Sequence, residues 1–249
     1  MLRSLLALGI LLVTASAATA SERALPPLGK RCGSPGVRAS VFRFPASDGT
    51  VLDGAVLGHG SAGVVLAHQA YENLCQWVPF GRVLAGKGYR VLVFDFRGAG
   101  LSASGAPHQG NLNTDVSAAA AERRRGATSV VLVGASLGGG SAVVSAAPAV
   151  RPRVAAVVSL SAPGTASLRG FSSTYAPLDP DRGAARLRAP VLFAAAKGDS
   201  VLPADAKRFY RLTRAPMKKL LIVPGSAHGV NLLDTATESV VLRFIRANT

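Results

Sequence analysis

Short apolar runs that lack a polar face recur along the chain, and they constrain its fold more than any other feature. The segments YRVLVFDF (89–96), SVVLVGAS (129–136) and VLFAAA (191–196) are apolar along nearly their whole length. Strands buried on both faces of a parallel sheet show this pattern, whereas strands with one exposed face alternate. Segments of helical spacing or composition separate the runs, for example TDVSAAAAERRRGA (114–127). The alternation predicts an α/β doubly wound, mostly parallel sheet from residue 63 to the C-terminus.

The segment before this alternation has the pattern of an antiparallel pair. SVFRFPA (40–46) and VLDGAVLG (51–58) flank Asp48-Gly49, a dipeptide typical of hairpin turns. Adding this pair gives a sheet of about eight strands. The chain has no internal repeat or linker, so we expect an N-terminal arm at 21–40 and one domain at 41–249.

The first residues of the chain, MLRSLLALGILLVTASAATASERA, have the pattern of a secretory signal peptide. Arg3 supplies a short positive region, Leu5–Val13 forms an apolar core, and Ala18-Thr19-Ala20 offers small residues for cleavage after Ala20. The alternative is a membrane anchor, but the apolar run is shorter than the roughly 20 residues that a span needs. We therefore expect a signal peptide at 1–20 and a secreted or extracytoplasmic protein.

The chain contains two cysteines, Cys32 and Cys75. In an exported protein such a pair predicts a disulfide; the alternative is two unrelated buried thiols. Their spacing fits no zinc motif, and we expect neither a metal nor a cofactor.

Charge says little about function. The formal net charge is +15. Hydrophobic residues make up 49% of the chain and charged residues 16%, and this composition excludes a disordered chain. The simplest interpretation of the basic segments is a solvated surface. The functional alternative is weak association with an anionic cell envelope. Basic residues are spread along the chain without an aromatic-and-basic motif, so we do not expect nucleic-acid binding, and the oligomeric state is left open.

A single hydroxyl, that of Ser136, stands where the strand SVVLVGA ends and a glycine-rich helix begins. For that hydroxyl to project from the sheet the chain must turn sharply, and the residues two before and two after must be tiny. They are Gly134 and Gly138. The alternatives are a glycine-rich packing turn or a phosphate cradle, but no G-K-[ST] follows.

This pattern resembles the G-x-S-x-G nucleophile elbow of the α/β-hydrolase superfamily, and the resemblance extends from about Val41 to the C-terminus. It implies that Ser136 is the nucleophile and that an acid and then a histidine follow it in the chain. His228 is the one histidine after Ser136, and it lies in PGSAHGV directly after the last predicted strand.

The acid of such a triad should follow the preceding strand. FAAAKGDSVLP supplies Asp199, which we expect to hold His228 in the useful tautomer. Asp205 is the nearest alternative, although it should lie on the next helix, and Asp179 and Asp181 rank lower because they precede the strand.

The resemblance also implies an oxyanion hole made of two backbone N–H groups. One is that of Leu137, at the start of the helix, and by position the other is that of Ala70. Relatives typically have His-Gly before the second donor, whereas this chain has His68-Gln69, so Gln69 is the alternative contributor.

Two further features flank the expected site. FDFRGAGLS (94–102) is similar to the superfamily's D-x-R-G-x-G-x-S segment, in which Asp95 and Arg97 should shape a loop rather than take part in chemistry. Tyr71, Trp77 and Phe80 either line an acyl pocket or belong to the core.

The interval 163–189, where many relatives insert a helical cap, has room for a loop and one helix. This minimal cap implies an open site. The chain is similar to small esterases and dienelactone-hydrolase-like proteins, and the resemblance implies a serine hydrolase. We expect it to cleave esters of small or exposed acyl groups through an acyl-enzyme on Ser136. Acyl transfer in the cell envelope by the same residues is one alternative. A non-catalytic, basic, exported binding protein on a hydrolase scaffold is the other.

Overall fold

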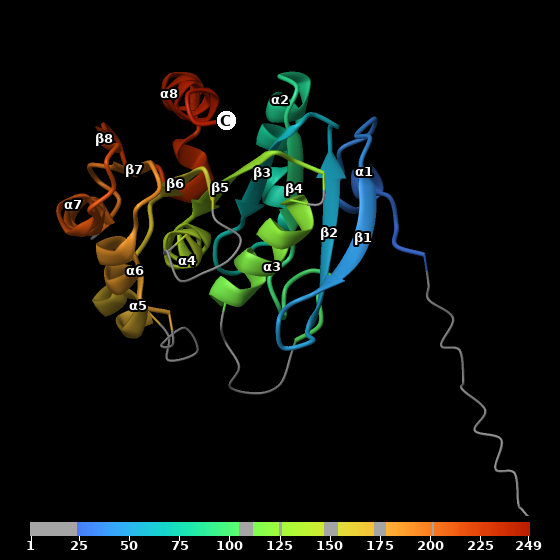
Figure 1. Cartoon of the computed structure of the whole chain (residues 1–249), viewed down its shortest axis with the longest axis horizontal. Helices are drawn as coiled ribbons and strands as arrows, with labels where there is room; N and C mark the ends of the chain where they lie inside the picture. The colour runs from blue at the N-terminus through green and yellow to red at the C-terminus, as the bar shows by residue number, and fades with distance from the viewer. Residues whose placement is uncertain (1–23, 105–111, 125, 147–153, 172–177, 201) are drawn as a thin grey trace, which may run out of the picture.

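An eight-stranded sheet runs through the molecule, and helices cover both of its faces (Figure 1). The computed structural model describes residues 24–104, 112–124, 126–146, 154–171, 178–200 and 202–249. The predicted signal peptide at 1–20 lies outside these residues. Among the described helices, none has both the length and the apolar character needed to cross a bilayer.

The sheet is mostly parallel, as predicted, and its strand order is β1-β2-β4-β3-β5-β6-β7-β8. β1 pairs with β2, and β2 with β4, in antiparallel fashion, whereas every other neighbouring pair is parallel. The strands are β1 (Ser40–Pro45), β2 (Val51–Leu57), β3 (Ala62–Ala67), β4 (Arg90–Phe94), β5 (Ser129–Ala135), β6 (Ala156–Leu160), β7 (Val191–Ala196) and β8 (Lys218–Val223).

The connections between strands are helical. The elements are α1 (Leu28–Arg31), the 3-10 helix η1 (Leu74–Trp77), α2 (Val78–Gly86), α3 (Leu112–Arg124), α4 (Leu137–Ser145), α5 (Thr165–Phe171), α6 (Pro180–Arg186), α7 (Leu202–Leu212), the 3-10 helix η3 (Gly229–Leu232) and α8 (Thr235–Arg246). Side-chain caps start several of them: the Asp179 carboxylate accepts the Arg182 N–H at α6, and the Asp234 carboxylate accepts the Thr237 N–H at α8.

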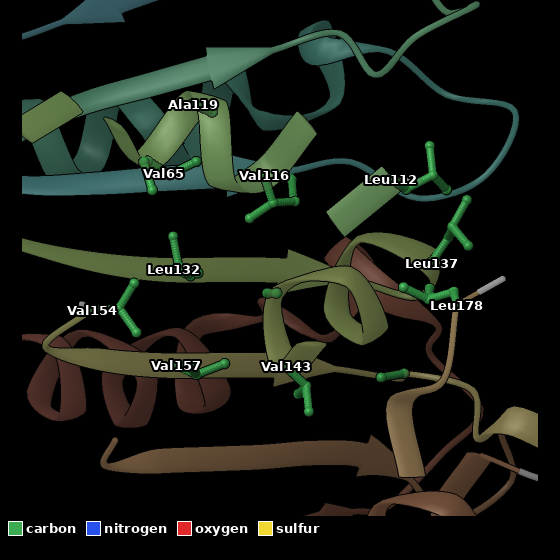
Figure 2. Close-up of a cluster of buried hydrophobic side chains, with 14 of the residues drawn as sticks. Val65, Leu112, Val116, Ala119, Leu132, Leu137, Val143, Val154, Val157 and Leu178 are labelled. Carbon is green, nitrogen blue, oxygen red and sulfur yellow. The ribbon is translucent and has the colours of Figure 1, made fainter. Parts of the chain in front are cut away.

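Alternate residues of each central strand point to opposite faces, which divides the core into two layers. Val65, Leu132 and Val157 pack under α3 and α4 on one face, as Figure 2 shows. Val64 and Val131 pack under α2 and α8 on the other face. Both layers are fully buried, which explains why these strands lack a polar face.

The order in which the chain visits the strands places two loops side by side. β3 lies between β4 and β5, so the connection after β3 and the connection after β5 leave the sheet in adjacent positions. Ala67 and Gly134 are paired across these two strands. Ligands bind in doubly wound sheets at such points, beyond the carboxyl ends of the strands.

Two details differ from the sequence prediction. The interval 163–189 holds two short helices, α5 and α6, rather than one, because Thr165 begins a helical turn that its small and polar residues did not reveal. Helix α3 begins at Leu112, before the predicted cap at Thr114.

The predicted hairpin is present: Asp48 accepts the Thr50 N–H at 3.0 Å, and Gly49 has a φ of 83°.

Candidate active site

Ser136 lies on a sharp turn between β5 and α4, with a φ of 51° and a ψ of −118°. A non-glycine residue in this region is strained by roughly 1–3 kcal/mol, and the surrounding structure must hold it there. The Ser136 N–H donates to the Leu160 carbonyl at 2.7 Å. A β-carbon on Gly134 would overlap the Gly138 carbonyl, and one on Gly138 would overlap the carbonyls of Ala67 and His68. Gly134 is therefore required because the two sides of the turn are in contact, and Gly138 because α4 begins against the end of β3.

Asp199 and His228 form a pair at the ends of β7 and β8. His228 Nδ1 lies 3.0 Å from each Asp199 carboxylate oxygen. A carboxylate can only accept, so Nδ1 carries a proton, and in the neutral imidazole the lone pair is then on Nε2. Asp199 is 7% exposed, and its Oδ2 also accepts the Ser161 hydroxyl at 2.7 Å.

The other candidate acids lie elsewhere. Asp205 is on α7, where it accepts the Gly164 N–H at 2.8 Å and the Ser167 hydroxyl at 2.7 Å. Asp179 caps α6, and Asp181 is paired with Arg208. The structure therefore brings Asp199, and none of these three, to His228.

Ser136, Asp199 and His228 line one cavity of about 430 Å³. The side chains of Ser136 and His228 share this cavity, and the described residues include no hydrogen bond between them. Such contacts often tighten only when substrate is bound. The remaining walls are mostly apolar and comprise Gln69, Ala70, Tyr71, Leu137, Pro163, Ser167, Leu168, Ser200 and Leu202.

Ala70 and Leu137, the residues of the two predicted oxyanion donors, both line this cavity. Leu137 is the first residue of α4, so its N–H is one of the groups that a helix leaves unpaired. Among the described residues, no partner is recorded for the N–H of Leu137 or of Ala70. The Gln69 N–H, by contrast, donates to Gln76 Oε1 at 3.1 Å. Gln69 is therefore the weaker of the two alternatives for the second donor.

A buried histidine holds the loop that carries Ala70. His68 Nε2 accepts the Phe96 N–H at 3.0 Å, so Nδ1 must carry the proton that it donates to the Gln69 carbonyl at 2.8 Å. Burial lowers the pKa of His68, which keeps the ring neutral in this arrangement. His68 is a support for the loop rather than a group of the cavity that contains Ser136.

A second cavity, of about 350 Å³, adjoins the first across Ala70 and Leu137. Tyr71 lines both and is 86% exposed. Trp77 and Phe80, by contrast, are buried in the layer beneath α2, so they belong to the core and not to a pocket.

The segment 94–102 is a hydrogen-bonded loop, as its sequence indicated. Asp95 accepts the N–H groups of Leu74 at 2.7 Å and Leu101 at 3.0 Å, and the Ser102 hydroxyl donates to the Asp95 carbonyl at 2.6 Å. A β-carbon on Gly100 would overlap the Asp95 carboxylate, which explains the glycine.

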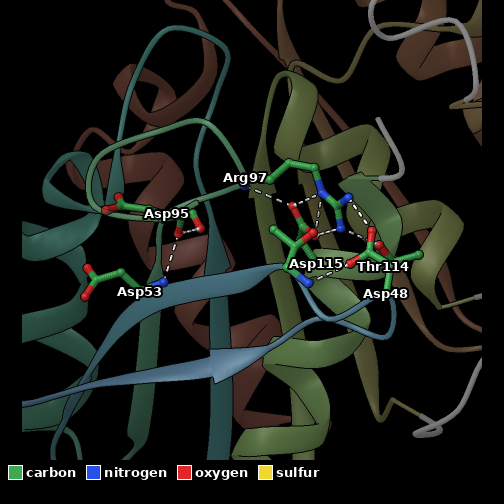
Figure 3. Close-up of polar contacts among 8 residues, drawn as sticks. Asp48, Asp53, Asp95, Arg97, Thr114 and Asp115 are labelled. Carbon is green, nitrogen blue, oxygen red and sulfur yellow. Dashed lines mark hydrogen bonds and ion pairs between the residues drawn. The ribbon is translucent and has the colours of Figure 1, made fainter. Parts of the chain in front are cut away.

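Arg97 ties the same loop to α3 and to the β1–β2 hairpin (Figure 3). Its guanidinium lies 2.5 Å from Asp115 and 2.6 Å from Asp48. Burial opposes the charge of Arg97, but these two carboxylates outweigh it and raise its pKa. The hydrogen bond from Arg97 is the main cause that lowers the pKa of Asp48 to about 2.

The predicted disulfide is present and joins Cys32 to Cys75, at the start of η1. Beside it, Arg31 forms ion pairs with two fully buried carboxylates, at 2.6 Å to Asp53 and 3.1 Å to Asp95. The N-terminal arm is thus bound to β2, to η1 and to the loop that follows β4. Within the described ranges, no cluster of three potential metal ligands occurs.

Comparison with known proteins agrees with the fold. A model of the alpha/beta hydrolase fold family matches residues 63–183, which include the turn at Ser136. The chain matches this family over those residues and has the α/β-hydrolase fold. No curated protein sequence matches this α/β-hydrolase.

Solved structures share the fold of this α/β-hydrolase at low sequence identity. An esterase from Pyrococcus furiosus has a TM-score of 0.69 at 16% identity, covering 88% of this chain and 93% of that one. An esterase from Rhodococcus sp. has a TM-score of 0.64 at 22% identity, covering 84% and 100%. A dienelactone hydrolase from Anabaena variabilis has a TM-score of 0.61 at 21% identity, covering 84% and 96%.

Sequence reasoning missed two residues of the site. Ser161 supports Asp199 from the end of β6, and its position after a buried strand was the one signal that could have indicated it. Gln76 binds the loop of Ala70 from η1, and nothing in its local sequence distinguishes it from a surface glutamine.

Proposed function

We propose that this α/β-hydrolase cleaves neutral carboxylic esters through an acyl-enzyme on Ser136. The observation that carries the proposal is the Asp199–His228 pair, which lines the same cavity as a strained serine at the start of a helix. The fold shared with esterases from Pyrococcus furiosus and Rhodococcus supports a hydrolase.

The reaction follows from the proton positions. His228 Nε2 takes the proton of Ser136 as Oγ attacks the ester carbonyl, and the imidazolium that forms is stabilised by Asp199. The negative charge on the former carbonyl oxygen is stabilised by the N–H groups of Leu137 and Ala70. Nε2 then protonates the departing alcohol. In the second half of the reaction Nε2 takes a proton from water, the water oxygen attacks the acyl-enzyme carbonyl, and Nε2 returns the proton to Ser136 Oγ as the acid leaves.

The cavity that contains Ser136 favours uncharged substrates. Its described lining includes apolar side chains such as Leu137, Leu168 and Leu202 but no lysine or arginine that would bind a substrate carboxylate. Its volume of about 430 Å³ suits small acyl groups, or larger ones that extend into solvent.

We also propose that the protein acts outside the cytoplasm, after removal of residues 1–20. The Cys32–Cys75 disulfide supports this location, because disulfides persist in oxidising compartments.

Labelling with a fluorophosphonate probe tests the proposed chemistry. Wild-type protein should be labelled and should hydrolyse p-nitrophenyl butyrate, whereas the folded Ser136→Ala variant should do neither, with a loss in kcat of about 10⁴–10⁶. Alanine fits the same turn, so circular dichroism should be unchanged. Folded wild-type protein that resists the probe would instead indicate a binding protein. Transesterification of an added alcohol in place of hydrolysis would indicate an acyltransferase.

A further inference from the structure

We propose that Gln76 is a positioning residue that aims the Ala70 N–H at the reacting carbonyl oxygen. The inference rests on the proposed function, and it concerns a residue that lies seven positions beyond the loop it supports. Gln76 belongs to η1 and does not line the cavity that contains Ser136.

The Gln69–Ala70 peptide is fixed on one side by its carbonyl. That carbonyl accepts the His68 Nδ1–H at 2.8 Å. In a trans peptide the C=O and N–H bonds point in opposite directions, so the Ala70 N–H points away from His68. Ala70 lines the cavity that contains Ser136.

One hydrogen bond to the carbonyl leaves the peptide free to rotate about the axis of that bond. The Gln69 N–H, one peptide earlier, removes this freedom by donating to Gln76 Oε1 at 3.1 Å. A backbone N–H can only donate, so the contact requires the oxygen of the Gln76 amide and not its nitrogen.

The element that carries Gln76 is rigid. The Asn73 side chain caps η1 by accepting the Cys75 N–H at 2.9 Å, and Trp77 is fully buried. The Leu74 N–H donates to Asp95 at 2.7 Å, and Cys75 is bound to Cys32. The backbone around Gln76 is therefore tied to other parts of the chain, and the Gln76 side chain reaches the Gln69 N–H from this held segment.

The Gln69 side chain provides a third contact, which links the same loop to the histidine loop. Its Oε1 is buried against Gly229, the residue after His228, where a β-carbon would overlap that oxygen. Gly229 also has a φ of 58°, so both its conformation and its neighbour require glycine. The Gln69 side chain thus lies between the loop of Ala70, the proposed second N–H donor, and the loop of His228, the proposed general base.

The test compares three substitutions at one position. Gln76→Met keeps the length but removes the acceptor, Gln76→Ala removes the whole contact, and Gln76→Glu keeps an acceptor for the Gln69 N–H. An oxyanion contact forms mainly in the transition state, so Met and Ala should lower kcat with KM changed less than about twofold. The loss should be at least about tenfold and should not exceed the ~10²–10³-fold value of a whole donor. Gln76→Glu should retain most of the activity.

Thr128→Val is the matched control. Its hydroxyl donates to the Ser61 carbonyl at 3.2 Å, so the variant also loses one side chain–backbone hydrogen bond. This bond lies before the first residues of β3 and β5, at the end of these strands away from Ser136. It should keep wild-type kcat. Wild-type kcat in Gln76→Met and Gln76→Ala would overturn the proposal, as would an equal loss in Gln76→Glu.

Amide hydrogen exchange separates this inference from the proposed function. The Gln69 N–H should exchange at least about tenfold faster in Gln76→Met than in wild type, whether or not the protein hydrolyses esters. Unlabelled, inactive wild-type protein would refute the esterase proposal alone. Unchanged exchange at Gln69 would refute the role of Gln76 alone.

Discussion

Replacing Arg31 should reveal the cost of two carboxylates buried beside the disulfide. Arg31 lies within ion-pair distance of Asp53 and Asp95, and both aspartates are fully buried. Arg31→Met keeps the side-chain length and removes the charge. Removing one partner from a buried pair costs about 3–5 kcal/mol, because the remaining charge stays in a low-dielectric site.

The loss should depend on pH in a defined direction. Burial raises the pKa of Asp53 above its usual value, and Arg31 opposes that rise. The folded state therefore binds more protons than the unfolded state, and stability falls as pH rises from the unfolded pKa of about 3.9 to the folded pKa. Without Arg31 the folded pKa of Asp53 rises further, so the range over which stability falls extends to higher pH.

Urea unfolding of the oxidised protein at pH 5 and pH 7.5 measures the effect. Arg31→Met should lose about 3–5 kcal/mol at pH 7.5 and less at pH 5, because the raised pKa of Asp53 favours uptake of a proton as the pH falls. Arg38→Met, an exposed arginine of the same arm, should lose little at either pH. An equal loss at both pH values, or a loss below about 1 kcal/mol, would refute the reasoning.

Three further results are expected. Asp199→Asn should lower kcat by about 10⁴ through loss of the histidine's orientation, whereas Asp205→Asn should change kcat little; the reverse ranking would reassign the acid. Across p-nitrophenyl esters of increasing acyl length, kcat/KM should be highest for short chains, and a steep rise towards long chains would contradict the proposed substrate class. Reducing the bond between Cys32 and Cys75, which are 43 residues apart, should destabilise the fold by up to ~4 kcal/mol. An unchanged Tm after complete reduction, verified by thiol titration, would count against that last expectation.

The fold could be predicted because its signals are local. Each buried strand is a short apolar run, and the turn at Ser136 needs Gly134 and Gly138 at fixed offsets. Chain order then indicated Asp199 and His228, which the structure brings together at the ends of adjacent strands.

The supports of the site could not be predicted because they depend on which elements meet in space. Gln76, Ser161 and Arg31 are ordinary residues in their own segments, and each acquires a partner only when the sheet is assembled. Helix α5 was missed for a related reason: the Asp205 carboxylate on α7 accepts the Gly164 N–H at its start, so a distant residue stabilises it.

The disulfide also decides how the molecule would respond to a pulling force applied to its two ends. The bond lies between Cys32 and Cys75, so tension from the N-terminal side would cross directly to η1. Strands β1, β2 and β3 lie inside the covalent loop and would carry none of that load. A machine that unravels the oxidised chain from its N-terminus would therefore pass from α1 directly to η1, α2 and β4, and would have to admit the closed loop beside the main chain.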